Sequence, residues 1–159
     1  MNPLLRYVLA GLAAGFTMLA ASYVTFVPAQ TILADPALQS AKFLDAFFGD
    51  PPQRAASSPL IFPLGLIGLG FLHALAFQIL YRGLPRNWFA AGLTYGFAAW
   101  LIAYFWFEYY LPWNVMLEPL PLVLLELVCW LGVMLAGGLA LAFVYRGRLV
   151  DHHLSLYRK

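Results

Sequence analysis

The sequence predicts an all-α integral membrane protein: a four-helix bundle with a short amphipathic helix at the membrane surface between the first two membrane-spanning helices. Three observations lead to this prediction: an apolar composition, four long apolar segments, and a sorting of charges between their ends. The 159-residue chain is 63% hydrophobic and only 10% charged, whereas a soluble domain carries about 25% charged residues. We therefore expect residues 1–159 to form a single domain within a lipid bilayer.

Four apolar segments are each long enough to cross a membrane as a helix. They cover residues 4–27, 60–81, 88–111 and 120–145, and a helix needs about 20 residues to cross roughly 30 Å of hydrocarbon. Membrane-spanning strands would be shorter and would alternate apolar with polar residues, a pattern these segments do not follow. The first segment is too long for the apolar core of a signal peptide, so we expect it to be a membrane anchor. The polar residues 146–159 are expected to form a cytoplasmic tail.

The charged residues separate into a basic end and an acidic end. Seven of the nine basic residues adjoin one set of segment ends: Arg6, Arg82, Arg86, Arg146, Arg148, Arg158 and Lys159. Six of the seven acidic residues adjoin the other set: Asp35, Asp45, Asp50, Glu108, Glu118 and Glu126. Because Lys and Arg stay on the cytoplasmic side, both termini are expected to be cytoplasmic, in a multi-pass protein of a bacterial-type inner (plasma) membrane. The chain has no basic stripe for phosphates, so we expect no nucleic-acid partner.

The only long connection, residues 28–59, is predicted to lie outside and to contain the amphipathic helix. Asp35 followed by Pro36 is typical of a helix start, and Gly49 is typical of a helix end. Between them, over residues 36–48, the apolar side chains share one helical face. A helix of this kind is expected to lie flat on the membrane, where it would cover or gate the mouth of the bundle.

Small residues recur at helical spacing within each segment. Gly11 and Gly15 are four apart in the first segment, as are Gly92 and Gly96 in the third. The second segment has Gly65, Gly68 and Gly70, and the fourth has Gly132, Ala136 and Ala140. Small residues four apart let helix backbones approach closely in a membrane. They predict packing within the chain, or against a second copy or a partner subunit of a larger membrane complex.

Polar and aromatic residues concentrate around the turn between the third and fourth segments. The candidate binding residues there are Tyr104, Glu108, Trp113, Asn114, Glu118 and Glu126. Thr94, Leu101 and Glu108 are seven apart, which predicts a shared face of the third helix with Tyr104 one turn below Glu108. We expect Glu108 and Glu118 to lie near the membrane interface, where water solvates them easily.

Glu126 is the most informative residue of this group. With a rise of about 1.5 Å per residue, it should lie roughly 10 Å below Glu118, inside the hydrocarbon. An ionised acid there costs at least ~2.5 kcal/mol, so Glu126 must face other helices, find a partner or keep its proton. Two interpretations remain open: a site for a proton, cation or polar ligand, and a structural hydrogen bond between helices.

His73 is the only histidine in the apolar segments, near the middle of the second. An imidazole at this depth relays protons or hydrogen-bonds a neighbouring helix. A second histidine for a bis-histidine haem is absent from the apolar segments. Gln78, nearer the inner end, is expected to be an amide that joins two helices.

Three functions follow from these features. We expect a non-catalytic accessory or oligomeric membrane protein, with an outward-facing polar pocket for a small or lipid-soluble ligand. The first alternative is a proton- or cation-coupled transporter or channel that uses Glu126, Glu108 and His73. The second is a membrane enzyme in which a glutamate acts as acid and base on a lipid-soluble substrate. The sequence contains no nucleotide-binding loop, paired cysteines or zinc-protease motif, so we expect no cofactor, no metal site and no assignable catalytic residue.

Overall fold

The computed structural model describes residues 2–49 and 58–156, and every regular element in this part of the chain is helical. The helices are α1 (Pro3–Leu33), α2 (Ala41–Phe48), α3 (Ile61–Leu80), α4 (Trp88–Ala99), α5 (Phe105–Glu108) and α6 (Leu120–Leu156). Shorter elements are the 3₁₀ turn η1 (Tyr81–Gly83) and the π-helical segments η2 (Trp100–Tyr104) and η3 (Tyr109–Val115). The predicted all-α class is confirmed.

Four of the helical stretches are long and apolar enough to cross a membrane. They are Pro3–Leu33, Ile61–Gly83, Trp88–Val115 and Leu120–Leu149. The four predicted segments are confirmed, and the first and third helices are longer than the sequence indicated. The predicted tail also begins as helix, because α6 continues without a break to Leu156.

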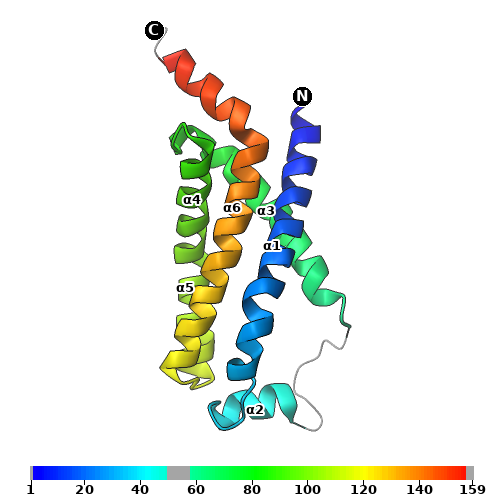
Figure 1. Ribbon diagram of the computed structural model, residues 1–159, viewed down its shortest axis with the longest axis vertical. Coiled ribbons are helices and arrows are strands. Elements are labelled where there is room, and N and C mark those ends of the chain that lie inside the picture. Colours follow the sequence, from blue (N-terminus) through cyan, green and yellow to red (C-terminus); the bar gives the residue numbers. More distant parts are fainter. Residues whose placement is uncertain (1, 50–57, 157–159) are drawn as a thin grey trace.

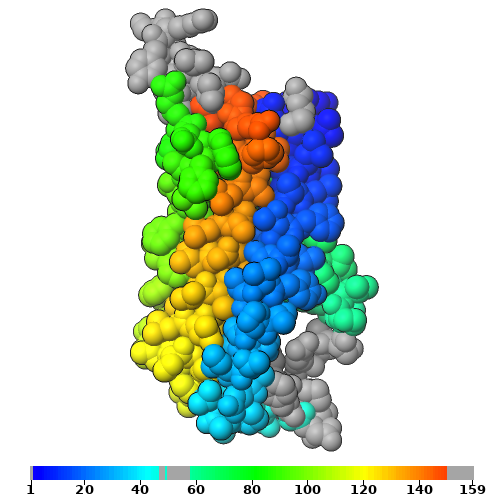
Figure 2. Space-filling view, in the orientation of Figure 1, coloured from blue at the N-terminus to red at the C-terminus, as the bar shows by residue number. Residues whose placement is uncertain are grey.

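The helices are arranged around α1 and α6, which pack along each other (Figure 1). On the face shown in Figure 2, α1 in blue and α6 in orange form a continuous surface. α3 packs mainly on α1, and α4 packs mainly on α6. The start of α1, the end of α6 and the α3–α4 turn lie at one end of the molecule, and α2 lies at the other end. The basic segment ends therefore gather at one end and the start of α6 lies at the opposite end.

Glycines allow α1 and α3 to touch through their backbones. A Cβ atom built on Gly15 would lie 2.7 Å from Ile67 Cα, and one built on Gly70 would lie 2.6 Å from Gly15 Cα. Real Cβ atoms do not approach other atoms this closely, so a larger residue would force the helices apart. Packing within the chain, predicted from Gly11 and Gly15, is confirmed at this crossing.

A second glycine contact joins α4 to α6. A Cβ built on Gly92 would lie 2.8 Å from Leu139 Cα, and one built on Gly96 would lie 2.9 Å from Leu135 Cα. The facing glycine of α6 is Gly138. Gly132, which begins the predicted small-residue stripe of α6, faces α1 instead, where a Cβ would lie 3.2 Å from Thr25 Cγ2.

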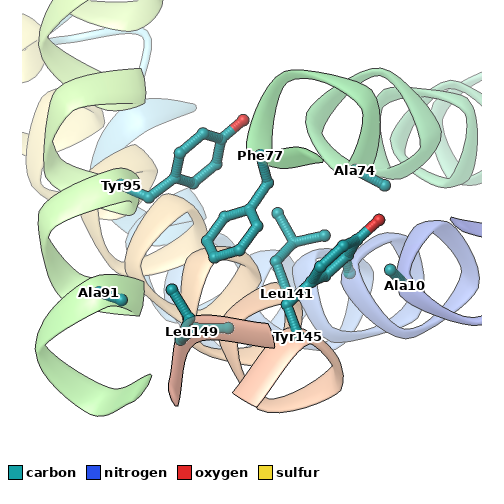
Figure 3. Packing of buried hydrophobic residues seen from close by; sticks show 10 residues of the cluster. Ala10, Ala74, Phe77, Ala91, Tyr95, Leu141, Tyr145 and Leu149 are labelled. Atoms are coloured by element: carbon teal, nitrogen blue, oxygen red, sulfur yellow. The ribbon is translucent and has the colours of Figure 1, made fainter. Parts of the chain in front are cut away.

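Buried aromatic rings hold α3, α4 and α6 together near the basic end (Figure 3). Phe77 is completely buried, with its ring centroid 5.1 Å from that of Tyr95 and 5.4 Å from that of Tyr145. The Tyr145 hydroxyl donates a hydrogen bond of 3.1 Å to Gln78 Oε1. The prediction that Gln78 joins two helices is confirmed.

The short helix α2 begins at Ala41, five residues later than predicted. Ser40 caps it, since its hydroxyl oxygen accepts a hydrogen bond of 3.1 Å from the amide of Phe43. The carboxylate of Asp35 instead accepts from the amide of Ala37 at 2.9 Å and forms a turn. The predicted start was wrong because an acid before a proline suits a turn as well as a helix start.

Replacing Gly70 with alanine should destabilise the protein, whereas the same change at Gly68 should not. The new methyl at Gly70 would meet the α1 backbone, but nothing lies within 4 Å of a Cβ at Gly68. We expect Gly70→Ala to lower the free energy of unfolding by about 1–3 kcal/mol, and Gly68→Ala to leave it unchanged or raise it by up to about 1 kcal/mol. Denaturant titration in detergent micelles measures both, and equal losses in the two variants would contradict the observed crossing.

Candidate functional site

Two π-helical segments set the direction of side chains in the third membrane-spanning stretch. η2 and η3 flank the single turn α5, which ends at Glu108. Each wide turn adds a residue and rotates the helix face, so Glu108 is buried while Thr94 and Leu101 are exposed. The predicted face shared by Thr94, Leu101 and Glu108 is therefore wrong. π-helical turns in membrane and soluble proteins frequently occur at functional sites.

The rotation brings Glu108 of α5 against Glu126 of α6. Their carboxyl groups lie close enough to interact directly. Glu108 is only 1% exposed, and its Oε2 atom has no hydrogen-bond partner within the described part of the chain. Glu126 is half-buried. The expectation that Glu108 is easily solvated is wrong, since it is more deeply buried than Glu126.

The two carboxyl groups lie in the wall of a pocket of about 250 Å³. Its lining comes from α1, α2, α5, η3 and α6: Phe26, Gln30, Phe43, Phe107, Glu108, Leu111, Pro112, Met116, Glu126 and Trp130. Tyr104 lies behind this wall and stacks on Trp130 with ring centroids 4.5 Å apart. The pocket thus combines two acids and one amide with a largely apolar and aromatic surface.

Glu118 lies outside this pocket, in the turn before α6, where it is hydrogen-bonded to the segment that connects α1 to α2. It is only 2% exposed, and its Oε1 atom accepts a hydrogen bond of 2.8 Å from Gln39 Nε2. The same amide nitrogen donates to the carbonyl of Leu33 at 2.7 Å. The expected easy solvation of Glu118 is wrong as well, and its contacts are structural in kind. Its neighbour Leu117 has a φ of 58°, the positive value that this tight turn requires.

Two further bonds tie the start of α2 to the end of η3. The Ser40 hydroxyl donates to the carbonyl of Met116 at 2.6 Å, and Lys42 Nζ donates to the carbonyl of Val115 at 3.3 Å. α2 is therefore held over the pocket, to which it contributes Phe43.

Asn114 and Trp113, also predicted as ligand-binding residues, do not line the pocket. Both are exposed on η3, and Trp113 packs on Tyr109 with ring centroids 5.0 Å apart. The π-helical turns that bury Glu108 leave these two side chains on the outer surface.

His73 lies in a different place from the glutamate pair. Its Nδ1 atom is 2.9 Å from the hydroxyl of Tyr95, and that hydroxyl also bonds the carbonyl of His73 at 3.1 Å. It lines a second cavity of about 250 Å³ that shares no lining residue with the first. The residues on which the transport hypothesis depends are thus divided, because Glu108 and Glu126 line one cavity and His73 lines the other.

Sequence reasoning missed the residues that complete the site. Gln30 and Trp130 line the pocket, and Gln39 is the partner of Glu118 although 79 positions separate them in the chain. An isolated glutamine or tryptophan carries no local pattern, so only the folded arrangement identifies them. Among the described residues, no three His, Cys, Asp or Glu side chains converge as metal ligands would.

Comparison of the chain with protein-family models, with curated proteins and with solved structures finds no match. The class that the fold defines is a chain with four apolar helices able to span a membrane.

Glu118→Gln should weaken the dependence of stability on pH. Burial raises the pKa of Glu118 above its ordinary 4.5, against an opposing effect of the bond from Gln39. A carboxyl whose pKa is raised by folding stabilises the fold fully below the unfolded value and loses that effect as the pH rises through its folded pKa. A proton on Glu118 also supplies a donor beside the buried Gln39 Oε1, which has no partner in the described chain.

The wild-type unfolding temperature in nanodiscs should therefore fall as the pH rises above about 4.5, and the fall should be smaller in Glu118→Gln. Glu108 and Glu126 are present in both proteins, but their charges interact with that of Glu118, so the difference reports Glu118 together with this coupling. Asp35→Asn, at another acid near the same end, is the control and should behave as wild type. An identical slope in all three proteins would show that Glu118 is not buried as described.

Proposed function

We propose that the chain is a small multi-pass inner-membrane protein that binds a small, lipid-soluble ligand without transforming it. In this proposal the four spans act as a bundle in the membrane, as an accessory or oligomeric unit, with α2 lying at the outer surface. The observation that carries the proposal is the meeting of Glu108 and Glu126 in the wall of a pocket whose other lining, apart from Gln30, is apolar and aromatic. Ligand sites commonly combine such a lining with a few polar groups that fix orientation.

The chemistry of the pocket favours a ligand with a hydrogen-bond donor. Glu108 Oε2 is buried and has no partner among the described residues, and a buried polar atom left unbonded costs about 1–3 kcal/mol. An amine or hydroxyl group of a ligand would supply that bond once neighbouring side chains move to expose the atom. The aromatic rings of Phe26, Phe43 and Trp130 would surround its apolar part.

The charge distribution supports an outward-facing pocket. Arg6, Arg82 and Arg86 belong to the end that holds the start of α1, the end of α6 and the α3–α4 turn, and basic residues remain cytoplasmic. The pocket lies near α2, at the other end of the molecule. Ligand would therefore enter from outside, past the helix that Ser40 and Gln39 fasten in place.

Binding is favoured over catalysis by the identity of the lining residues. The glutamate pair meets the requirement of the enzyme hypothesis for two neighbouring acid–base groups. Apart from that pair, however, the described lining consists of one amide and of apolar or aromatic side chains, which suit the orientation of a ligand. Binding of a ligand needs only the carboxyl, amide, apolar and aromatic groups that line the pocket.

Glu108→Gln and Glu126→Gln should weaken binding of a lipid-soluble amine. We suggest 4-butylbenzylamine as the probe and 4-butyltoluene, which has no donor, as the matched ligand. Each variant should lose at least about tenfold in affinity for the amine, or roughly 1.4 kcal/mol, measured by calorimetry in nanodiscs against empty nanodiscs. The toluene should bind wild type and variants equally.

Asp35→Asn is the control variant for this experiment, because Asp35 is an acid near the same end that does not line the pocket. It should bind the amine as wild type does. Equal affinity for the amine in wild type and in both glutamate variants would reject the pocket as the binding site.

Proton- or cation-coupled transport is a second candidate function, favoured by the same carboxyl pair. Two adjacent carboxyl groups shielded from water do not both ionise readily, so the pair is suited to holding one proton or one cation. The hypothesis now rests on Glu108 and Glu126 alone, since His73 lines a separate cavity.

If the protein is such a transporter, Glu126→Gln should abolish uptake driven by a pH gradient while leaving the fold intact. The measurement is the accumulation in liposomes of a radiolabelled quaternary ammonium, (4-butylbenzyl)trimethylammonium, which crosses lipid poorly by itself. His73→Phe should transport as wild type does, and protein-free liposomes give the background. Unchanged uptake in Glu126→Gln would remove this residue from the mechanism.

A further inference from the structure

The second cavity, between α3 and α4, plays no part in the function proposed above. Its volume is about 250 Å³, and small residues form much of its wall. The lining residues are His73, Ala76, Leu80, Tyr95, Ala98, Ala99, Ile102 and Ala103. Apart from His73 and Tyr95, these side chains are all apolar.

His73 lies at the middle of the membrane-spanning stretch Ile61–Gly83. At that depth the bilayer supplies almost no water, so polar atoms must find partners in the protein or in a bound molecule. The ring is half-buried and belongs to the cavity wall. Each of its two nitrogen atoms therefore needs a hydrogen-bond partner of its own.

The Nδ1 atom is satisfied by Tyr95. The Tyr95 hydroxyl has one proton but makes two contacts, one with Nδ1 at 2.9 Å and one with the carbonyl of His73 at 3.1 Å. A carbonyl oxygen only accepts, so both contacts become hydrogen bonds only if the hydroxyl donates to the carbonyl and Nδ1–H donates to the hydroxyl. This arrangement selects the neutral tautomer that carries its proton on Nδ1.

The locked tautomer leaves Nε2 as an acceptor without a partner. In the part of the chain that the structure describes, no hydrogen bond to Nε2 forms. Tyr95 belongs to α4, and its ring contacts the imidazole edge-on, with ring centroids 5.8 Å apart and ring planes at 90°. The contact between Tyr95 and Phe77 shown in Figure 3 keeps the tyrosine ring in place.

We propose that the α3–α4 cavity binds a lipid-soluble molecule bearing a ring hydroxyl, of the phenol class, whose O–H donates to His73 Nε2. This O–H would bond Nε2, the acceptor in the cavity wall that has no hydrogen-bond partner among the described residues. The alanines of α4 and η2 leave room for a flat ring, and Leu80 and Ile102 offer apolar contacts for an attached hydrocarbon chain. The oxidised or methylated counterpart of such a ligand would have no proton to donate, so the site discriminates between them.

The first test measures the tautomer by ¹⁵N NMR of histidine-labelled protein in nanodiscs. The chain has three histidines, and the background substitutions His152→Gln and His153→Gln leave His73 as the single signal. Nδ1 should carry the proton in the unliganded protein, and Tyr95→Phe, which removes both hydrogen bonds, should give a mixture of tautomers. A proton on Nε2 in the parent protein would overturn the proposal.

The second test compares 4-hexylphenol with 4-hexylanisole, its methyl ether. The phenol should shift the Nε2 resonance at saturation and bind at least tenfold more tightly than the ether, which should leave the resonance unchanged. Equal shifts and equal affinities for the two molecules would show that Nε2 does not accept a hydrogen bond from the ligand.

Two matched substitutions separate the cavity from the surrounding lipid. Ala98→Phe fills the cavity without removing either bond of His73, and it should abolish the phenol-induced shift. Ala20→Phe places the same ring on an exposed position of α1 and should preserve the shift. Retention of the shift in Ala98→Phe would overturn the assignment of this cavity. None of these experiments changes Glu108 or Glu126, so their outcomes are independent of the function proposed above.

Discussion

Close approach of helix backbones at glycine is the constraint on which the arrangement of this protein depends. Gly15 and Gly70 bring α1 against α3, and Gly92 with Gly138 brings α4 against α6. Between lipid-exposed helices the hydrophobic effect gives little attraction, so tight contact of backbones has to supply much of it. Each pair of helices is held together at the point where the two helices cross. The space left between the pairs is filled by larger side chains, and both cavities lie in that space.

The acidic end shows how the chain satisfies polar groups away from water. Gln39 bridges the carbonyl of Leu33 and the carboxyl of Glu118, so one amide closes the end of α1 and the turn before α6 together. Ser40 adds a bond to Met116 and caps α2. The same residues therefore set the position of α2 and shape the outer wall of the glutamate pocket. We therefore propose a structural role for Glu118, which bonds Gln39, and a binding role for Glu108, which lines the pocket.

The sequence predicted the helices better than it predicted the site. Apolar length identified all four spans, and small residues four apart identified the contact face of α1. Residue spacing failed in the third span, because it assumes a regular helix and the π-helical turns around Glu108 rotate the face. Pro112 within η3 indicates an irregular helix there, but no residue of η2 marks the wide turn that precedes Glu108. The pairing of Glu118 with Gln39 was equally hidden, since it depends on how the loop from α1 folds back.

Both cavities offer a hydrogen-bond acceptor to a ligand, but they suit polar groups of different charge. In the first, the acceptor is a carboxyl of a pair, which holds a proton or a cation and so suits a basic group. In the second, it is a neutral imidazole nitrogen whose role is fixed by Tyr95, and a charged ligand would gain no counter-ion there. A charge within hydrocarbon is costly without such a partner. Basic ligands should therefore select the glutamate pocket, where the carboxyl pair offers a counter-charge that the histidine cavity lacks.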